Sequence, residues 1–120
     1  MLLHTRIKKD IPRHITRFPK LRSGKPYQFQ SWRKDKNGVE YLVYAFDGTR
    51  KNVRHVKRIP LQELALAVQL FKRNRSFDRS DFNKVCTAAA KSGPCGFAVI
   101  GRYLEFRHKA HYQGRGKGFV

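Results

Sequence analysis

The side chains best suited to chemistry in this sequence are cationic, and the chemistry they suit is phosphate binding. The 120 residues contain 27 Lys and Arg against eight Asp and Glu, which gives a formal net charge of +19. The like charges of a free globule with this imbalance repel one another, so the composition predicts a polyanionic partner. Nucleic acid is the partner that we favour. A basic surface that only keeps the protein soluble needs far less charge.

The acidic and histidine residues do not form a recognisable catalytic set. Nucleases hold metal ions with a cluster of carboxylates, and only Asp78 and Asp81 are spaced closely enough to begin one. His108 and His111 stand three apart in a basic, Gly-rich tail, where a nucleic-acid contact fits better than a metal site. We therefore expect a binding protein and not an enzyme, with no metal and no cofactor.

The two cysteines and the hydropathy pattern predict a location. Cys86 and Cys95 have no histidine partner at zinc-like spacing, which favours reduced, packed thiols. No apolar run approaches the roughly 18 residues of a membrane span. The apolar start Met1-Leu2-Leu3 is too short for a signal-peptide core. We expect a cytoplasmic or nucleoid-associated protein without membrane contact.

Residues 27–73 carry the pattern on which the other expectations depend. Aromatic or β-branched residues alternate with polar ones and predict strands over 27–33, 39–46 and 49–58, with turns at Asn37-Gly38 and Asp47-Gly48. Apolar residues at helical spacing then predict a helix over 61–72, with Pro60 suited to its first turn. The result is a three-stranded antiparallel sheet with one face packed on a helix and the other free.

The third predicted strand is rich in cations and contains no acid. Its positive residues are Arg50, Lys51, Arg54, Lys57 and Arg58. A charged edge strand discourages association between sheets, which is one explanation. A strand that faces a nucleic-acid groove needs cations for phosphates and forked donors for base edges, and we favour this explanation.

The order of elements, the turn placement and the charge of residues 27–71 resemble the three-stranded DNA-binding modules of tyrosine-recombinase arm-binding domains and of the plant AP2 group. The resemblance implies that the sheet enters the major groove, and it suggests an accessory protein of a mobile element. The contacts that it implies are Arg50, Lys51, Arg54, Lys57 and Trp32. Trp32 belongs with them because strand alternation places it on a polar face with Gln28 and Gln30.

Residues 1–26 are predicted to form a basic arm, extended or partly ordered, whose few apolar residues pin it to the body. Apolar residues follow helical spacing, but Pro12 and Pro19 interrupt the pattern. Such arms lie along phosphates or enter a minor groove, and a flexible terminus without a fixed role is the alternative. The candidate contacts in and just after this pattern are Arg6, Lys8, Lys9, Arg13 and Arg17.

Residues 74–120 are predicted to form a pair of helices and a Gly/Arg-rich tail. Ser80 can cap a helix over 81–91, and a second helix over 95–107 would complete a helix-turn-helix-like pair. Gly96 and Gly101 weaken that second helix and indicate close approach of another backbone or of a nucleic-acid strand. We expect the tail to be a wing or a flexible phosphate grip. The candidate contacts here are Arg102, Arg107, Lys109, Arg115 and Lys117.

Together these patterns predict an α+β protein with a basic arm (1–26), a β-β-β-α module (27–73) and a helical pair with a tail (74–120). The favoured function is DNA binding by an accessory or regulatory protein, within a nucleoprotein complex that can include a protein partner. An RNA-binding subunit of a ribonucleoprotein is a second possibility, because Tyr27, Trp32 and Tyr112 would suit single-stranded RNA if exposed. A basic adaptor for an acidic protein surface is a third.

Overall fold

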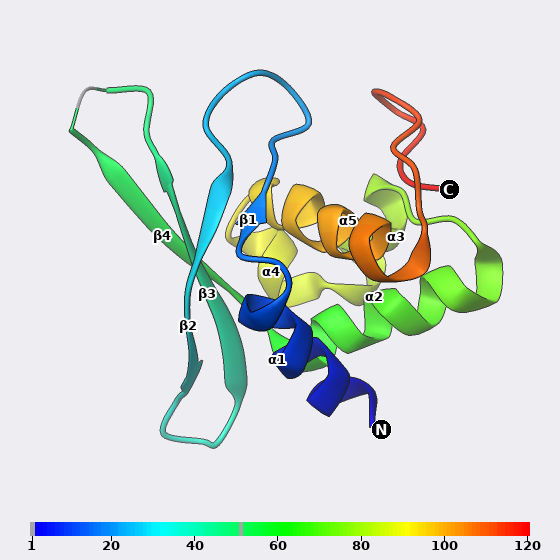
Figure 1. The fold of residues 1–120 in the computed structure, drawn as a ribbon, viewed down its shortest axis with the longest axis horizontal. Coiled ribbons are helices and arrows are strands. Elements are labelled where there is room, and N and C mark those ends of the chain that lie inside the picture. Colours follow the sequence, from blue (N-terminus) through cyan, green and yellow to red (C-terminus); the bar gives the residue numbers. More distant parts are fainter. Residues whose placement is uncertain (1, 51) are drawn as a thin grey trace.

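The chain folds into a four-stranded antiparallel sheet with helices along one side of it (Figure 1). This computed structural model describes residues 2–50 and 52–120. The elements are α1 (Leu3–Arg13), β1 (Arg17–Phe18), β2 (Tyr27–Lys34), β3 (Glu40–Asp47), β4 (Arg54–Pro60), α2 (Leu61–Asn74), α3 (Arg79–Val85), α4 (Thr87–Lys91) and α5 (Cys95–His108). The α+β class is confirmed, with one strand and further helices beyond those predicted.

The sheet order is β1-β2-β3-β4, and its inner face lies beneath the helices. Trp32, Leu42 and Ile59 form one row across three strands on that face. The central strand β3 is buried on both faces, as its apolar sequence predicts: Leu42 and Tyr44 join the helical core, while Val43 and Ala45 lie on the other side. Residues 1–26, 27–73 and 74–120 all contribute to a single cluster of buried side chains.

A bulge in β2 changes which of its side chains point inward. The pairing with β3 shifts by one residue between Phe29 and Ser31, so the extra residue Gln30 reverses the alternation after it. Trp32 therefore lies on the inner face with Phe29, and its indole N–H donates to the Ile11 carbonyl at 2.7 Å. The expectation that Trp32 shares a polar face with Gln28 is wrong.

Helix α2 confirms the predicted helix after the sheet and continues it to Asn74. Its apolar stripe is buried, with Leu64, Val68 and Phe71 fully inaccessible. Arg75 closes the helix in a left-handed conformation, and its N–H bonds the Phe71 carbonyl. Burial of this stripe removes the inner face of the sheet from the surface.

The N-terminal segment is part of the body and not an extended arm. Ile7 and Ile11 on α1 are fully buried, and Phe18 pairs with Tyr27 to add β1 to the sheet. Ile11 leaves the helical conformation (φ −107°, ψ 112°) just before Pro12, because proline disfavours the α region for the residue that precedes it. The proline thus ends the regular helix without removing its apolar face from the core.

The C-terminal helices match the predicted helix-turn-helix only in outline. The predicted 81–91 helix is divided at Cys86 into α3 and α4. Asp78, and not Ser80, caps α3: its carboxylate accepts the Asp81 N–H at 2.9 Å, and the Asp81 carboxylate accepts the Asp78 N–H in return. Helix α5 has few exposed positions, since most of its first ten residues are buried.

The tail folds back onto α5, which explains a glycine inside that helix. Phe119 is fully buried, and its backbone exchanges two hydrogen bonds with Phe77. A Cβ on Gly101 would lie 2.0 Å from the Phe119 ring. The close approach inferred from Gly101 is therefore made by a side chain of the protein itself, and not by another backbone or a nucleic-acid strand.

One buried carboxylate joins the two ends of the fold. Asp10 on α1 is 1% exposed and accepts hydrogen bonds from the Tyr103 hydroxyl (2.7 Å) and from two nitrogens of Arg107 (2.6 and 2.9 Å) on α5. Burial opposes ionisation of Asp10, but these hydrogen bonds and the charges of Arg107 and Arg6 outweigh it. The pKa of Asp10 is therefore below its ordinary value of 3.8.

We expect Asp10→Asn to lower the free energy of unfolding at pH 7 by about 3 kcal/mol, because Arg107 loses its counter-charge. A depressed pKa stabilises the fold above the unfolded-state pKa, and this contribution fades as pH falls through the folded-state pKa. The gap between wild type and variant, measured by urea denaturation, should therefore narrow below about pH 4. Asp47→Asn, which removes an exposed ion pair, is the control and should cost less than about 1 kcal/mol. Equal losses in the two variants would contradict the assignment.

Candidate nucleic-acid interface

The outer face of the sheet is the surface that the fold leaves uncovered. The described helices lie on the opposite side, with α4 beside the edge strand β4 (Figure 1). We call this surface the open face. The pairing register gives it Arg17, Gln28, Ser31, Arg33, Tyr41, Val43, Ala45, Asp47, Arg54, Val56 and Arg58.

Four arginines from three strands project from the open face. Arg17, Arg33, Arg54 and Arg58 are all exposed. No bulge interrupts the pairing of β3 with β4, so Arg54 and Arg58 point outward while Lys57 points inward. The amide of Gln28 lies between the arginines of β1 and β4, and its Oε1 is 3.5 Å from Arg54 Nη2. Guanidinium forks and amides are the groups that bind phosphates and base edges.

An arginine–tyrosine pair lies on this surface toward the β2–β3 turn. The Arg58 guanidinium stacks on the Tyr41 ring at 4.1 Å from its centroid. Arg33 is the strand partner of Tyr41 on the other side, and its Nε donates to the Ser31 hydroxyl at 3.2 Å. A stacked guanidinium keeps its edge nitrogens available, so this group can bind phosphate and can also offer a plane to a base.

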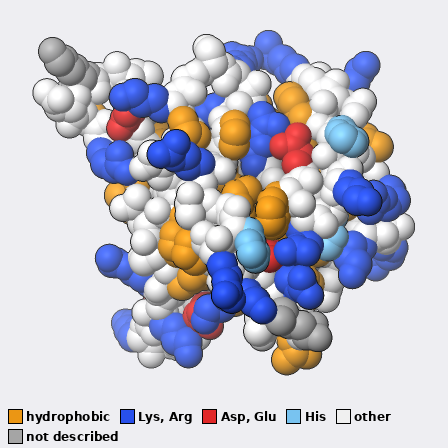
Figure 2. Space-filling model, viewed as in Figure 1, with side chains coloured by type: hydrophobic (Ala, Val, Ile, Leu, Met, Phe, Trp, Pro, Cys, Tyr) orange, Lys and Arg blue, Asp and Glu red, His pale blue; other side chains and the backbone are white. Residues whose placement is uncertain are grey.

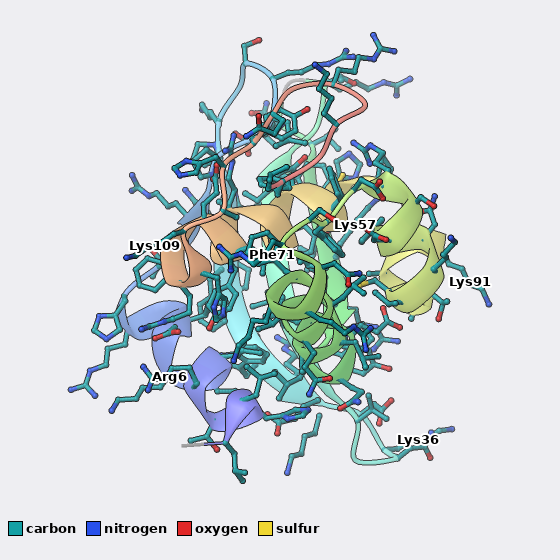
Figure 3. The ribbon with its side chains drawn as sticks, turned by 90° about the vertical axis from the view of Figure 1, so that its right-hand side faces the viewer. Arg6, Lys36, Lys57, Phe71, Lys91 and Lys109 are labelled. Atoms are coloured by element: carbon teal, nitrogen blue, oxygen red, sulfur yellow. The ribbon has the colours of Figure 1, made fainter. Side chains whose placement is uncertain are left out.

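Helix α4 adds a wall, so that part of the open face becomes a groove of about 1140 Å³. The floor is formed by β2, β3 and β4, and the wall carries Lys91 and Ser92. Lys57 reaches across from the edge strand and donates to the Ser92 carbonyl. Seen from the helix side, Lys91 projects at one margin of the molecule, while Arg6 and Lys109 lie at the other (Figure 3).

The acids near the open face are engaged in local structure. Asp47 lies 3.4 Å from Arg54 and 3.5 Å from Lys25. Asp35 in the β2–β3 turn accepts the N–H groups of Val39 and Asn37, and these bonds hold its pKa below the ordinary value. Positive charge therefore predominates across the face, and in the view of Figure 2 the blue of Lys and Arg likewise exceeds the red of acids.

The structure separates the predicted contact residues into several groups. Arg17, Arg54 and Arg58 lie on the open face, and Lys57 lines the groove. Arg50 is exposed in the β3–β4 connection, and Lys51 lies outside the described residues.

The remaining predicted contacts lie elsewhere. Lys8 pairs with Glu40, and Arg6, Lys9 and Arg13 are on α1, on the helix side. Three others have partners within the protein: Trp32 bonds Ile11, Arg107 bonds Asp10, and Arg102 bonds Glu105 and the carbonyls of Pro19 and Lys20. Lys109, Arg115 and Lys117 are exposed at or beyond the end of α5.

Sequence reasoning missed several residues of this surface. Arg33, Gln28, Gln30, Tyr41 and Lys91 all lie on the open face or line the groove. The predicted strand over 27–33 does contain Arg33. Its side chain points outward because of the bulge at Gln30, and no turn residue in the sequence indicates that bulge. Lys91 joins the surface only because α4 packs beside β4.

Comparisons with protein-family models, with curated proteins and with solved structures returned no match. Among the described residues, no three metal-ligating side chains come together. Within the same residues, every helix is too short or too polar to cross a membrane.

A pair of hydrogen bonds between α2 and α4 holds the wall of the groove in place. The Glu63 carboxylate on α2 accepts the N–H groups of Ala88 and Ala89, both at 2.9 Å, at the start of α4. We expect Glu63→Ala to cost about 1–2 kcal/mol of unfolding free energy and to speed hydrogen exchange at these two amides. Gln69→Ala, at an exposed position of the same helix, should change stability by less than about 0.5 kcal/mol. Unchanged exchange in Glu63→Ala would show that α4 is held by other contacts.

Proposed function

We propose that this protein binds nucleic acid, with duplex DNA as the preferred form, through the open face of its sheet. The observation that carries the proposal is the set of four outward arginines, Arg17, Arg33, Arg54 and Arg58, on a sheet face that no described helix covers. A face exposed only to water gains nothing from four arginines. A polyanion gives them partners.

The dimensions of the sheet suit a major groove. Neighbouring strands lie about 4.8 Å apart, so β2, β3 and β4 together span about 10 Å, and the major groove of B-DNA is about 12 Å wide. The β3–β4 hairpin extends beyond the helices (Figure 1), so it can follow the groove without a clash from the body. In this arrangement Arg33 and Arg58 face bases, and Arg17 and Arg54 at the margins face phosphates.

RNA is the second candidate, and one observation favours it. The stacked pair of Arg58 and Tyr41 offers a flat surface to an unpaired base. By contrast, two of the aromatic residues expected to bind RNA bases are not on the open face. Trp32 lies on the inner face of the sheet, and Tyr27 is buried. Gel shifts of duplex DNA, single-stranded DNA and structured RNA at one salt concentration separate the two candidates.

The open-face arginines should contribute more than their charge. We expect Arg33→Gln and Arg58→Gln each to weaken binding to a preferred duplex by about 5- to 150-fold and to relax discrimination at one base position. Lys9→Gln and Arg13→Gln remove the same charge from α1 and should weaken all sequences equally, by less than about fivefold. Fluorescence anisotropy on a sequence panel measures both effects. If all four variants lose the same affinity and none changes base discrimination, binding depends only on net charge, and the sheet does not read the sequence.

Binding should also depend steeply on salt. Six cations lie on the open face and its rim: Arg17, Arg33, Arg54, Lys57, Arg58 and Lys91. If each displaces a counterion, affinity falls about a thousandfold between 50 and 200 mM salt. A flat response over this range would favour the adaptor for an acidic protein surface instead.

A further inference from the structure

A second basic cavity lies away from the open face, at the end of the molecule where the C-terminal hairpin folds back. The connection between β1 and β2 and the C-terminal segment both rise at this end (Figure 1). The cavity has a volume of about 830 Å³, within the range of small-molecule sites. Its walls come from four segments of the chain: residues 20–27, the start of α3, the start of α5, and residues 112–118.

Four cations line this cavity against one carboxylate. The cations are Lys20, Arg22, Arg79 and Arg115, and the carboxylate is Asp78, whose Oδ1 caps α3. Arg79 is held in place, because its guanidinium lies 4.7 Å from the centroid of the Phe97 ring and donates to the Pro94 carbonyl. Arg22 and Arg115 are exposed, and no hydrogen bond or ion pair of their side chains is found among the described residues. Arg22 and Arg115 are thus cations that make no such contact with the described part of the fold.

The geometry points to a binding site for a phosphomonoester group of a nucleotide, presented by a strand end or by a free nucleotide. A terminal phosphate carries a charge of about −1.5 to −2 and three acceptor oxygens, whereas an internal phosphodiester carries only one negative charge. Several guanidinium forks that converge from different segments match the dianionic group better. Ser80 and Tyr112 also line the cavity, and their hydroxyl groups can form hydrogen bonds with the sugar.

Two arms of one experiment distinguish the sources of this group. In the first arm, which rests on the proposed function, internally labelled DNA duplexes carry a phosphate at the 5′ ends of their strands, at the 3′ ends or at neither, and anisotropy gives the ratio of affinities. We expect a phosphate at one end to tighten binding by about tenfold. In the second arm, millimolar nucleoside monophosphate is added and the melting temperature is measured, which requires no strand binding. Inorganic phosphate is the reference.

Matched variants assign the effect to the cavity. Arg22→Gln combined with Arg115→Gln should abolish both the end preference and the nucleotide-induced rise in melting temperature. Lys9→Gln combined with Lys36→Gln removes the same charge at exposed sites outside the cavity and should preserve both. Arg33→Gln combined with Arg58→Gln should weaken phosphorylated and unphosphorylated duplexes equally, so that failure of the open face is told apart from failure of this cavity.

The outcomes decide the proposal. An end preference lost in the cavity variant assigns the site to strand ends, and a thermal shift without an end preference assigns it to free nucleotides. Absence of both responses in the wild type would overturn the proposal. So would responses that persist in the Arg22→Gln, Arg115→Gln protein or that inorganic phosphate reproduces in full.

Discussion

The buried carboxylate of Asp10 is the interaction on which the arrangement of the two faces depends. It joins α1 to α5 through Arg107 and Tyr103, and both helices stand on the same side of the sheet (Figure 1). Each partner costs much less to bury in this cluster than alone, because the hydrogen bonds and opposite charges compensate for lost hydration. With α1 and α5 both on the inner side, no described helix covers the outer side of the sheet.

The division between faces is set by register, and register is set by a single extra residue. The bulge at Gln30 places Trp32 against Ile11 and turns Ser31 and Arg33 outward. Without it, the indole would stand on the open face and an arginine would be buried, which is unfavourable for both side chains. The bulge therefore directs the apolar side chain of Trp32 into the core and the positive charge of the next residue, Arg33, to the outer face.

Local signals allowed much of the fold to be predicted, and long-range contacts account for what was missed. The turn at Asn37-Gly38 and the stripe of α2 follow from residue types alone. The predicted strand over 49–58 is wrong in its bounds, because β4 is Arg54–Pro60 and follows a longer connection than a turn at Asp47-Gly48 provides. Helix α1 could not be predicted in this way, because Pro12 argues against a helix. The contacts of Asp10 and of the buried residues beside it, which favour the helix, are visible only in the structure. Likewise the partner of Gly101 is Phe119, 18 residues later. Of the site, the cations of β4 were predictable, whereas Arg33 and Lys91 required the register and the packing of α4.

Under the proposed function, the net charge of +19 and the open face contribute differently to the recognition of nucleic acid. Cations such as Lys9 and Arg13 on α1 lie apart from the open face, so they add to the long-range field that attracts a polyanion without fixing its orientation. Orientation needs rigid groups at fixed spacing, and paired strands hold Arg33, Tyr41 and Arg58 in that way. Loss of charge on α1 should therefore act mainly on the association rate, and loss of an open-face arginine on dissociation and discrimination. Under the proposed function, the sheet is thus the part of this protein that would supply specificity for a nucleic-acid sequence.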